Sequence, residues 1–143
     1  MAKAITEKLL KDKKLNHPVE VVAAGLAPTR KTEASYAARF VIKEMFDEDL
    51  LRDHKPTQLT PEIIHSADLI LLMDRSLLVS GSKSLPPEKT FILKEFFGGA
   101  GDIKDPYPDG RDDRTIGRYR KCAQELRQVL SQNLDALVSK LEV

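Results

Sequence analysis

The feature that most constrains the fold is an unbroken apolar run, Leu69 to Met73, enclosed between Asp68 and Asp74. Five apolar residues are too few for a helix with one buried face, and far too few to span a bilayer. The sharp polar borders are typical of a parallel strand that is buried on both faces. Because parallel strands need crossover connections, we expect helices before and after this run.

Helices are indeed expected on both sides of the run. Three long segments have apolar residues at helical spacing and predict amphipathic helices: residues 2–14, 32–48 and 115–141. Thr60, Pro61 and Glu62 predict a further helix start, because Thr suits the N-cap, Pro the first helical position and Glu the first turn. A short helix is expected to open at Asp74 and to end near Gly81.

Two more strands are expected besides the apolar run. One is Val19–Ala24, which is rich in β-branched residues and ends at Gly25, and the other covers residues 89–93. The alternation of helices and strands predicts an α/β domain with a parallel sheet. The ligand site of such a sheet lies beyond the carboxyl ends of its strands, which here fall at Gly25, Met73 and Leu93.

The long helices have identifiable core faces. In the 32–48 helix, Thr32 is the expected N-cap. Four side chains of that helix are expected to face the core: Tyr36, Phe40, Val41 and Met45. The core face expected for the C-terminal helix comprises Ile116, Tyr119, Leu126, Val129, Leu134, Leu137 and Leu141.

Composition limits the classes of function. The 143 residues predict a single domain over residues 1–143. Lys and Arg number 23 and Asp and Glu 22, so the net charge is +1, and neither nucleic acid nor a membrane is an expected partner. The single cysteine, Cys122, excludes an intramolecular disulfide and fits a reducing compartment. Lys and Glu interrupt the first residues, where a signal peptide has an apolar core, so we expect a cytoplasmic protein.

No metal site is expected. Aspartates at 109, 112 and 113 alternate with Arg111 and Arg114, a pattern typical of a solvated loop. His17 and His65 are isolated and lack the spacing of metal ligands.

Several stretches, taken together and in order, resemble the low-molecular-weight protein-tyrosine phosphatases, a group that includes related arsenate reductases. These stretches are residues 22–25, 54–62, 67–76, 91–99 and 102–107. The resemblance implies a three-layer α/β/α fold with a short parallel sheet. It also implies hydrolysis of a phosphomonoester through a cysteinyl-phosphate, with no cofactor and no metal. The implied substrate is a phosphotyrosine-containing protein or a small aryl phosphate.

The resemblance also assigns roles to four residues. Asp105 corresponds to the general acid that protonates the leaving phenolate, and Tyr107 to an aromatic wall of the substrate pocket. His54 corresponds to a residue that braces the nucleophile loop, and Asp74 to the cap of a short helix beside the site. Simpler interpretations remain open for each: an Asp-Pro turn, a loop aromatic, a surface histidine and a plain N-cap.

The chain departs from the family pattern at its start. The family's nucleophile lies in a loop of the form Cys-x5-Arg-Ser/Thr-Pro, after the first strand and usually before Met-Ala-Glu-Ala. This sequence begins with Met1-Ala-Lys-Ala, so the first strand, the nucleophilic cysteine and the phosphate-binding arginine are expected to be absent. Cys122 is not a substitute, because it lies within a predicted helix and Gln128, not an arginine, follows six residues later.

Three functions therefore remain open. The first is a phosphatase whose catalytic loop lies outside these 143 residues. The second is a pseudophosphatase that acts as a binding or interaction module. The third, an arsenate reductase relative, would need more cysteines than Cys122. We expect the chain as written to be inactive, and we expect an open sheet edge to favour a homodimer or a loosened fold.

Overall fold

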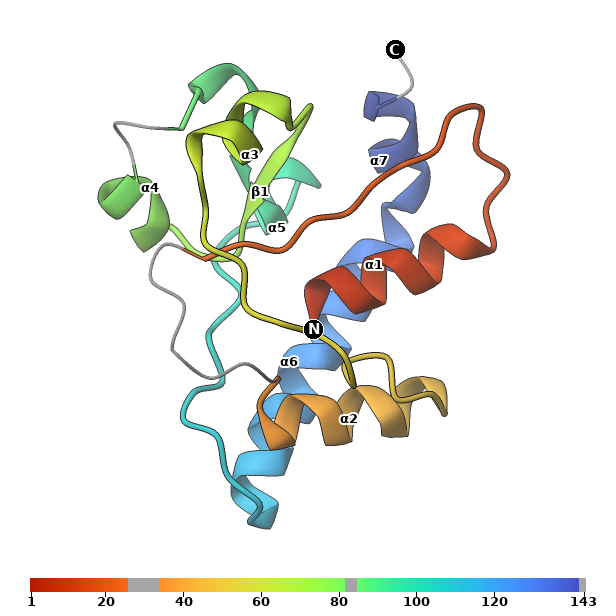
Figure 1. Cartoon of the computed structure of the whole chain (residues 1–143), viewed down its shortest axis with the longest axis vertical. Helices are drawn as coiled ribbons and strands as arrows, with labels where there is room; N and C mark the ends of the chain where they lie inside the picture. Colours follow the sequence, from red (N-terminus) through yellow and green to blue (C-terminus); the bar gives the residue numbers. More distant parts are fainter. Residues whose placement is uncertain (26–33, 82–84, 142–143) are drawn as a thin grey trace.

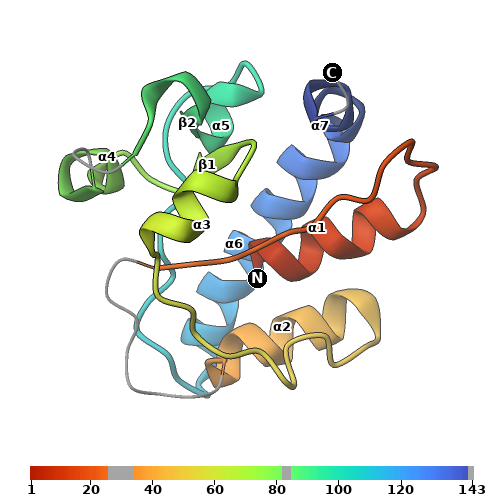
Figure 2. The same ribbon diagram turned by 45° about the horizontal axis from the view of Figure 1, so that its top comes forward.

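The computed structural model describes residues 1–25, 34–81 and 85–141. Its sheet consists of β1 (Ile70–Leu72) and β2 (Thr90–Ile92), which run parallel with Ile70 opposite Thr90 and Leu72 opposite Ile92. The connection between them contains α4 (Ser76–Gly81) and the 3-10 turn η1 (Pro87–Lys89). The apolar run and residues 89–93 thus form parallel strands, as predicted (Figures 1 and 2).

Strand β1 is covered on both faces. Ile70 and Leu72 pack with Ile64 and Ile92 in one hydrophobic cluster. Leu71, between them, contributes to the core formed by the long helices. Because successive side chains of a strand point to opposite faces, this alternation gives the layered α/β arrangement that the sequence predicts.

Three helices form the larger core. Both α1 (Ala2–Lys11) and α2 (Tyr36–Phe46) pack against α6 (Asp113–Gln132), as Figure 1 shows. Ile5 and Ile42 are fully buried between them, and burial of a side chain of this size contributes about 1.5–3 kcal/mol. The arrangement makes α6 the central element of the helical side of the molecule.

The helix predicted from Thr60 is α3 (Pro61–Ser66). The Thr60 hydroxyl accepts a hydrogen bond from the backbone N–H of Ile63 at 3.2 Å, as expected of an N-cap. At the other end, the Lys89 ammonium donates to the Ala67 carbonyl at 2.7 Å. These contacts fix α3 beside the sheet.

Two helix predictions need correction. The C-terminal helix is not continuous: α6 ends at Gln132 and α7 covers Leu134–Leu141. Asn133 separates them, and its side-chain amide donates to the Val129 carbonyl at 2.7 Å, a bond through which Asn competes with helical backbone bonding. The sequence also missed α5 (Leu93–Phe96), a single turn directly after β2.

Helix α2 is shorter than predicted. It begins after Ser35, whose hydroxyl accepts from the backbone N–H of Ala38 at 3.2 Å, whereas the expected cap Thr32 lies outside the described residues. The expectation that Tyr36 and Phe40 face the core is wrong, because 41% and 43% of their surfaces are exposed. The face that meets the core instead comprises Ala37, Ala38, Val41 and Ile42, since two alanines let α2 approach closely.

The strand predicted at Val19–Ala24 is also wrong in its hydrogen bonding. Among the described residues, only Gly25 of this region pairs, in an isolated parallel bridge with Gln58. Its N–H donates to the Thr57 carbonyl and its carbonyl accepts from Leu59, both at 2.9 Å. Burial nevertheless alternates along the segment as in a strand, so the sequence pattern does predict which side chains face inward.

Candidate active site

The candidate site lies at the carboxyl end of β1, where a loop of residues 102–110, here called the Asp105 loop, begins. The backbone N–H of Ile103 donates to the Met73 carbonyl at 2.8 Å. The Asp102 carboxylate accepts from the backbone N–H of Arg75 at 3.1 Å. The loop thus starts at the edge of the sheet where a parallel α/β protein is expected to bind its ligand.

Asp74 lies at the same edge and caps α4. Its carboxylate accepts hydrogen bonds from the Ser76 backbone N–H, at 2.6 Å, and from the Ser76 hydroxyl. These two bonds hold the pKa of Asp74 below its usual value. These bonds are those expected of a capping residue, while the role of Asp74 in ordering a site remains a prediction.

The other end of the Asp105 loop is tied to two helices by aspartates. The Asp109 carboxylate accepts from the backbone N–H groups of Tyr36 and Ala37, both at 2.9 Å. Asp112 caps α6 by accepting from the Thr115 N–H at 2.9 Å and from the Thr115 hydroxyl at 2.8 Å. Residues 111–114 are exposed, as expected of a solvated loop, while Asp109 is half-buried, and both aspartates also accept bonds at the start of a helix.

Sequence reasoning also missed Arg118, which holds the middle of the loop. Its guanidinium donates from Nε to the Pro106 carbonyl at 3.3 Å and from Nη2 to the Pro108 carbonyl at 3.2 Å. Every residue has a backbone carbonyl, so the sequence pattern does not indicate which carbonyls an arginine will bond to, and this role of Arg118 could not be predicted. The Asp112 cap was detectable, because Asp three residues before Thr115 at a helix start is a known capping pattern.

Asp105 itself is exposed within this well-bonded loop. Its carboxylate accepts from the backbone N–H of Tyr107 at 3.0 Å. Tyr107 is 75% exposed, so the side chain expected to form a pocket wall projects into solvent. The Asp105 charge lies close to α6, where it adds to the effect of burial in raising the pKa of Tyr119. The bond to Tyr107 is compatible both with an Asp-Pro turn and with a positioned acid.

His54 lies apart from these residues. It is half-buried beside the start of α1, where burial lowers its pKa, assisted by the positive charges of the Met1 amino group and Lys3. Within the described parts of the chain, no hydrogen bond or ion pair joins His54 to Asp105, Tyr107 or Asp74. Burial and the two neighbouring positive charges thus disfavour the protonated imidazole.

Cys122 has the properties of an unreactive thiol. It is half-buried within α6. Burial raises its pKa, and the carboxylates of Glu125 and Asp105 act in the same direction. Because nucleophilic cysteines need a lowered pKa, this environment agrees with the sequence-based view that Cys122 is structural.

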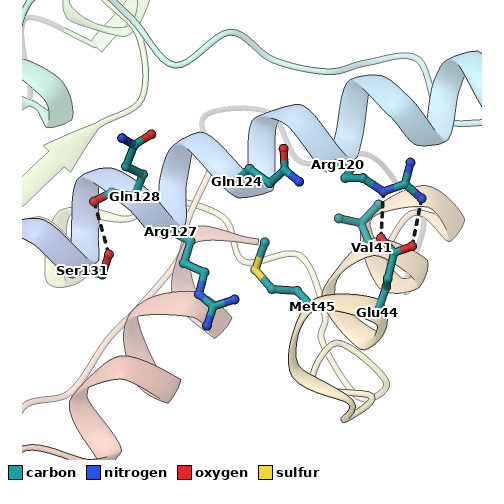
Figure 3. A pocket seen from close by; sticks show the side chains of 8 residues that line it. All are labelled: Val41, Glu44, Met45, Arg120, Gln124, Arg127, Gln128 and Ser131. Atoms are coloured by element: carbon teal, nitrogen blue, oxygen red, sulfur yellow. Dashed lines mark hydrogen bonds and ion pairs between the residues drawn. The ribbon is translucent and has the colours of Figure 1, made fainter.

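The hollows on the surface lie elsewhere. A groove of about 360 Å³ lies between α2 and α6, floored by Val41 and Met45 and bordered by the ion pair of Arg120 with Glu44 (Figure 3). A second hollow, of about 570 Å³, lies between α1 and residues 18–21. Neither of these two hollows is lined by Asp105 or Tyr107, both of which are exposed.

The described residues contain no group of three or more His, Cys, Asp or Glu side chains placed to hold a metal ion. In the same part of the chain, no helix is long and apolar enough to cross a membrane.

Comparisons with known proteins are consistent with this geometry. The family described as low molecular weight phosphotyrosine protein phosphatase matches residues 1–143. A protein-arginine-phosphatase of Geobacillus stearothermophilus is 34% identical over 142 residues, covering 94% of this chain and 84% of the relative. One from Bacillus subtilis is 28% identical over 135 residues, covering 92% and 83%. The solved low molecular weight protein tyrosine phosphatase of T. tengcongensis is 30% identical with a TM-score of 0.76, covering 98% of this chain and 86% of the other.

Proposed function

This chain belongs to the low molecular weight phosphotyrosine protein phosphatase family, and we propose from that premise that its Asp105 loop recognises phosphorylated side chains of proteins. The supporting observation is that an irregular loop is bonded at once to Met73, directly after β1, to α2 and to α6. Such bonding supports both ends of the loop that carries Asp105 and Tyr107, without regular structure in the loop itself. A preorganised loop of this kind is what a binding or catalytic site requires.

Asp105 is the proposed general acid. A carboxylic acid on an exposed edge can donate its proton to the leaving oxygen of a phosphomonoester and can later accept a proton from attacking water. Tyr107, projecting beside it, would contact the organic part of the substrate. Asp74 and His54 would act only through the order they give to neighbouring segments.

We infer that none of these 143 residues acts as the nucleophile. Their single thiol is the half-buried Cys122, whose raised pKa disfavours the thiolate. We therefore expect the 143-residue chain by itself to bind a phosphorylated side chain without hydrolysing it, as a pseudophosphatase does. Joined to a Cys-x5-Arg loop, the same residues would supply the acid for turnover through a cysteinyl-phosphate.

The substrate is proposed to be either phosphotyrosine or phosphoarginine. Two of the relatives described above are named protein-arginine-phosphatases and a third is named a tyrosine phosphatase. An aromatic wall such as Tyr107 suits a phenol, whereas the carboxylate of Asp105 suits a guanidinium. Comparing turnover of para-nitrophenyl phosphate and of phosphoarginine by the fused protein described below would decide between them.

The experiment has two proteins and two matched variants. The 143-residue chain is assayed beside a fusion in which a strand and a Cys-x5-Arg-Ser/Thr-Pro loop precede Met1. Each is made as wild type, as Asp105→Asn and as Asp102→Asn. Asp102 is the matched control, because it is an exposed aspartate of the same loop. Among the described residues its carboxylate accepts from the backbone N–H of Arg75, a bond that the amide oxygen of Asn can keep.

We expect no turnover from the chain and measurable turnover from the fusion. Loss of a general acid lowers the rate by about 10²–10⁴-fold, so Asp105→Asn should abolish most of the fusion's activity while Asp102→Asn keeps it. Turnover by the 143-residue chain that disappears with Asp105→Asn would show that we have misplaced the nucleophile. If the folded fusion binds phosphate and Asp105→Asn leaves its rate of turnover unchanged, Asp105 is not the general acid.

We also propose a cytoplasmic location, which the single cysteine favours, and self-association through the short two-stranded sheet. Sedimentation of the purified chain tests the second proposal. A monomer at all concentrations with a sharp thermal transition would contradict it.

A further inference from the structure

Two of the exposed aromatic side chains, Tyr36 and Phe40, lie together on α2. Tyr36 and Phe40 lie one helical turn apart on α2, with their rings stacked at 6.1 Å between centroids and 28° between planes. They are 41% and 43% exposed, although the sequence pattern predicts them in the core. Exposed aromatic surface of this kind, beyond what packing requires, is typical of an interaction site.

An arginine completes this surface. The guanidinium carbon of Arg111 lies 4.4 Å from the centroid of the Tyr36 ring. We call Tyr36, Phe40 and Arg111 the aromatic–arginine patch. Tyr, Phe and Arg are residues enriched at protein interfaces, where rigid rings give contact area at a low entropy cost.

Hydrogen bonds of the neighbouring aspartates fix the backbone on which the patch lies. Asp109, two residues before Arg111, bonds to the backbone N–H groups of Tyr36 and Ala37. Asp112, the residue after Arg111, is fixed as the cap of α6. Arg111 therefore sits on a short segment bonded to a helix on each side, and little order has to be created when a partner binds.

The described carboxylates near the patch bond to groups other than Arg111. Asp109 and Asp112 accept from backbone N–H groups, as above, and Asp113 lies close enough to Arg120 to raise the pKa of that guanidinium, after the larger effect of Glu44. Among the described residues, no carboxylate forms an ion pair with Arg111. Its guanidinium N–H groups are thus available for an anionic group that approaches over the two rings.

We propose that the aromatic–arginine patch docks an acidic peptide segment of a partner protein. A carboxylate of the partner bonds to Arg111, and an apolar side chain beside that carboxylate packs on Tyr36 and Phe40. The near-neutral net charge of +1 favours a peptide over a nucleic acid or an anionic bilayer, which need a broader basic surface. The site goes beyond the proposed function, since it needs neither a nucleophile nor a phosphoryl group.

The structure supplies a matched control. Arg127 also lies over an aromatic ring, with its guanidinium carbon 5.1 Å from the centroid of Phe46, in the groove of Figure 3. It differs from Arg111 in having no exposed aromatic ridge beside it, because Phe46 is half-buried. Arg111→Gln and Arg127→Gln thus remove the same kind of charge from the same kind of contact at two different places.

The probe is a short synthetic peptide of alternating glutamate and leucine, titrated into the 143-residue chain and followed by amide chemical shifts. We expect saturable binding with shifts centred on the patch. Loss of one charge-assisted hydrogen bond weakens binding by about tenfold, so Arg111→Gln should do so while Arg127→Gln changes affinity less than about twofold. Phe40→Ala should weaken binding by about fivefold.

Urea midpoints of each variant show whether it remains folded, which is expected because the altered side chains are exposed. Absence of saturation at millimolar peptide overturns the proposal, as does equal weakening by Arg127→Gln. Equal binding of a lysine–leucine peptide would show that Arg111 selects no charge. The chain can also be tested with phosphatidylserine vesicles and with oligothymidine. If either binds through Arg111 while the acidic peptide does not, the patch belongs to a membrane or to single-stranded nucleic acid, and the docking of a peptide is refuted.

Discussion

The Asp105 loop and the segment from Val19 to Gly25 are both irregular, but polar bonds hold the first and apolar contacts hold the second. In the loop, Asp102 and Asp109 accept from backbone N–H groups outside it. From α6, Arg118 donates to backbone carbonyls of the loop. Val19 and Val21 instead pack against the cluster of Leu10, Leu134 and Leu137, while the regular bonding of a strand is missing. A segment can thus be placed by its side-chain pattern alone, whereas placing an exposed carboxylate needs directional bonds.

The largest effect is expected from breaking the loop at Asp109. Asp109→Ala leaves two N–H groups at the start of α2 without their acceptor, so we expect a loss of about 2 kcal/mol in the free energy of unfolding, measured in urea. Asp109→Asn, which keeps one carbonyl oxygen, should lose about half as much. A loss below about 0.5 kcal/mol for the alanine variant would mean that these bonds do not hold the loop.

A smaller effect is expected in the apolar segment, where burial should decide the outcome. Val21→Ser removes a half-buried apolar side chain and should cost about 1 kcal/mol, while Val22→Ser, at a position 52% exposed, should be nearly neutral. Urea unfolding of the pair tests this, because the two positions are neighbours with the same side chain. Equal costs would show that the alternation of burial has no energetic meaning.

The smallest effect is expected from acid, which should weaken the bonds of Asp112 at the start of α6, directly after the Asp105 loop. Two bonds from Thr115 hold the pKa of Asp112 below its usual value, so protonation of Asp112 is disfavoured in the folded state. The resulting stability is present above the unfolded pKa of about 3.9 and is lost as the pH falls through the lower folded value. The urea midpoint should therefore fall less between about pH 6 and pH 3 in Asp112→Asn than in the wild type.

Hydrogen exchange would locate this acid effect. We expect the amides of Thr115 and Ile116, at the start of α6, to lose protection in acid before that of Gly25, whose bonds are between backbone groups. The opposite order would place the acid-sensitive bonds outside the loop and its flanking helices.

Local signals in the sequence were sufficient where bonding is local. Thr60 and Pro61 predicted α3, and the run ending at Met73 predicted β1, because caps and buried strands depend on neighbouring residues. The prediction failed at Val19–Ala24, since a strand also needs a partner that its own residues do not specify.

The candidate site was predictable in its place but not in its bonding. The rule for parallel sheets indicated the carboxyl ends of the strands, where Ile103 of the Asp105 loop bonds to Met73, while Asp105 itself was assigned from the family resemblance. Asp109 and Arg118 were missed because Asp109 bonds to groups 72 and 73 residues away and Arg118 to backbone carbonyls. Tyr36 and Phe40 were misassigned because hydrophobic spacing cannot tell a core face from an exposed ridge on the same helix.

Strand β1 connects the packing of two hydrophobic clusters to the start of the Asp105 loop. Ile70 and Leu72 belong to one core, Leu71 to another, and the next carbonyl, that of Met73, receives the first bond of the Asp105 loop. Each of the two clusters packs against one face of the same three-residue strand. A substitution that changes the side-chain volume in either cluster is therefore expected to affect the position of this strand. We therefore expect a shift of β1 to move the Met73 carbonyl, to which Ile103 of the Asp105 loop bonds.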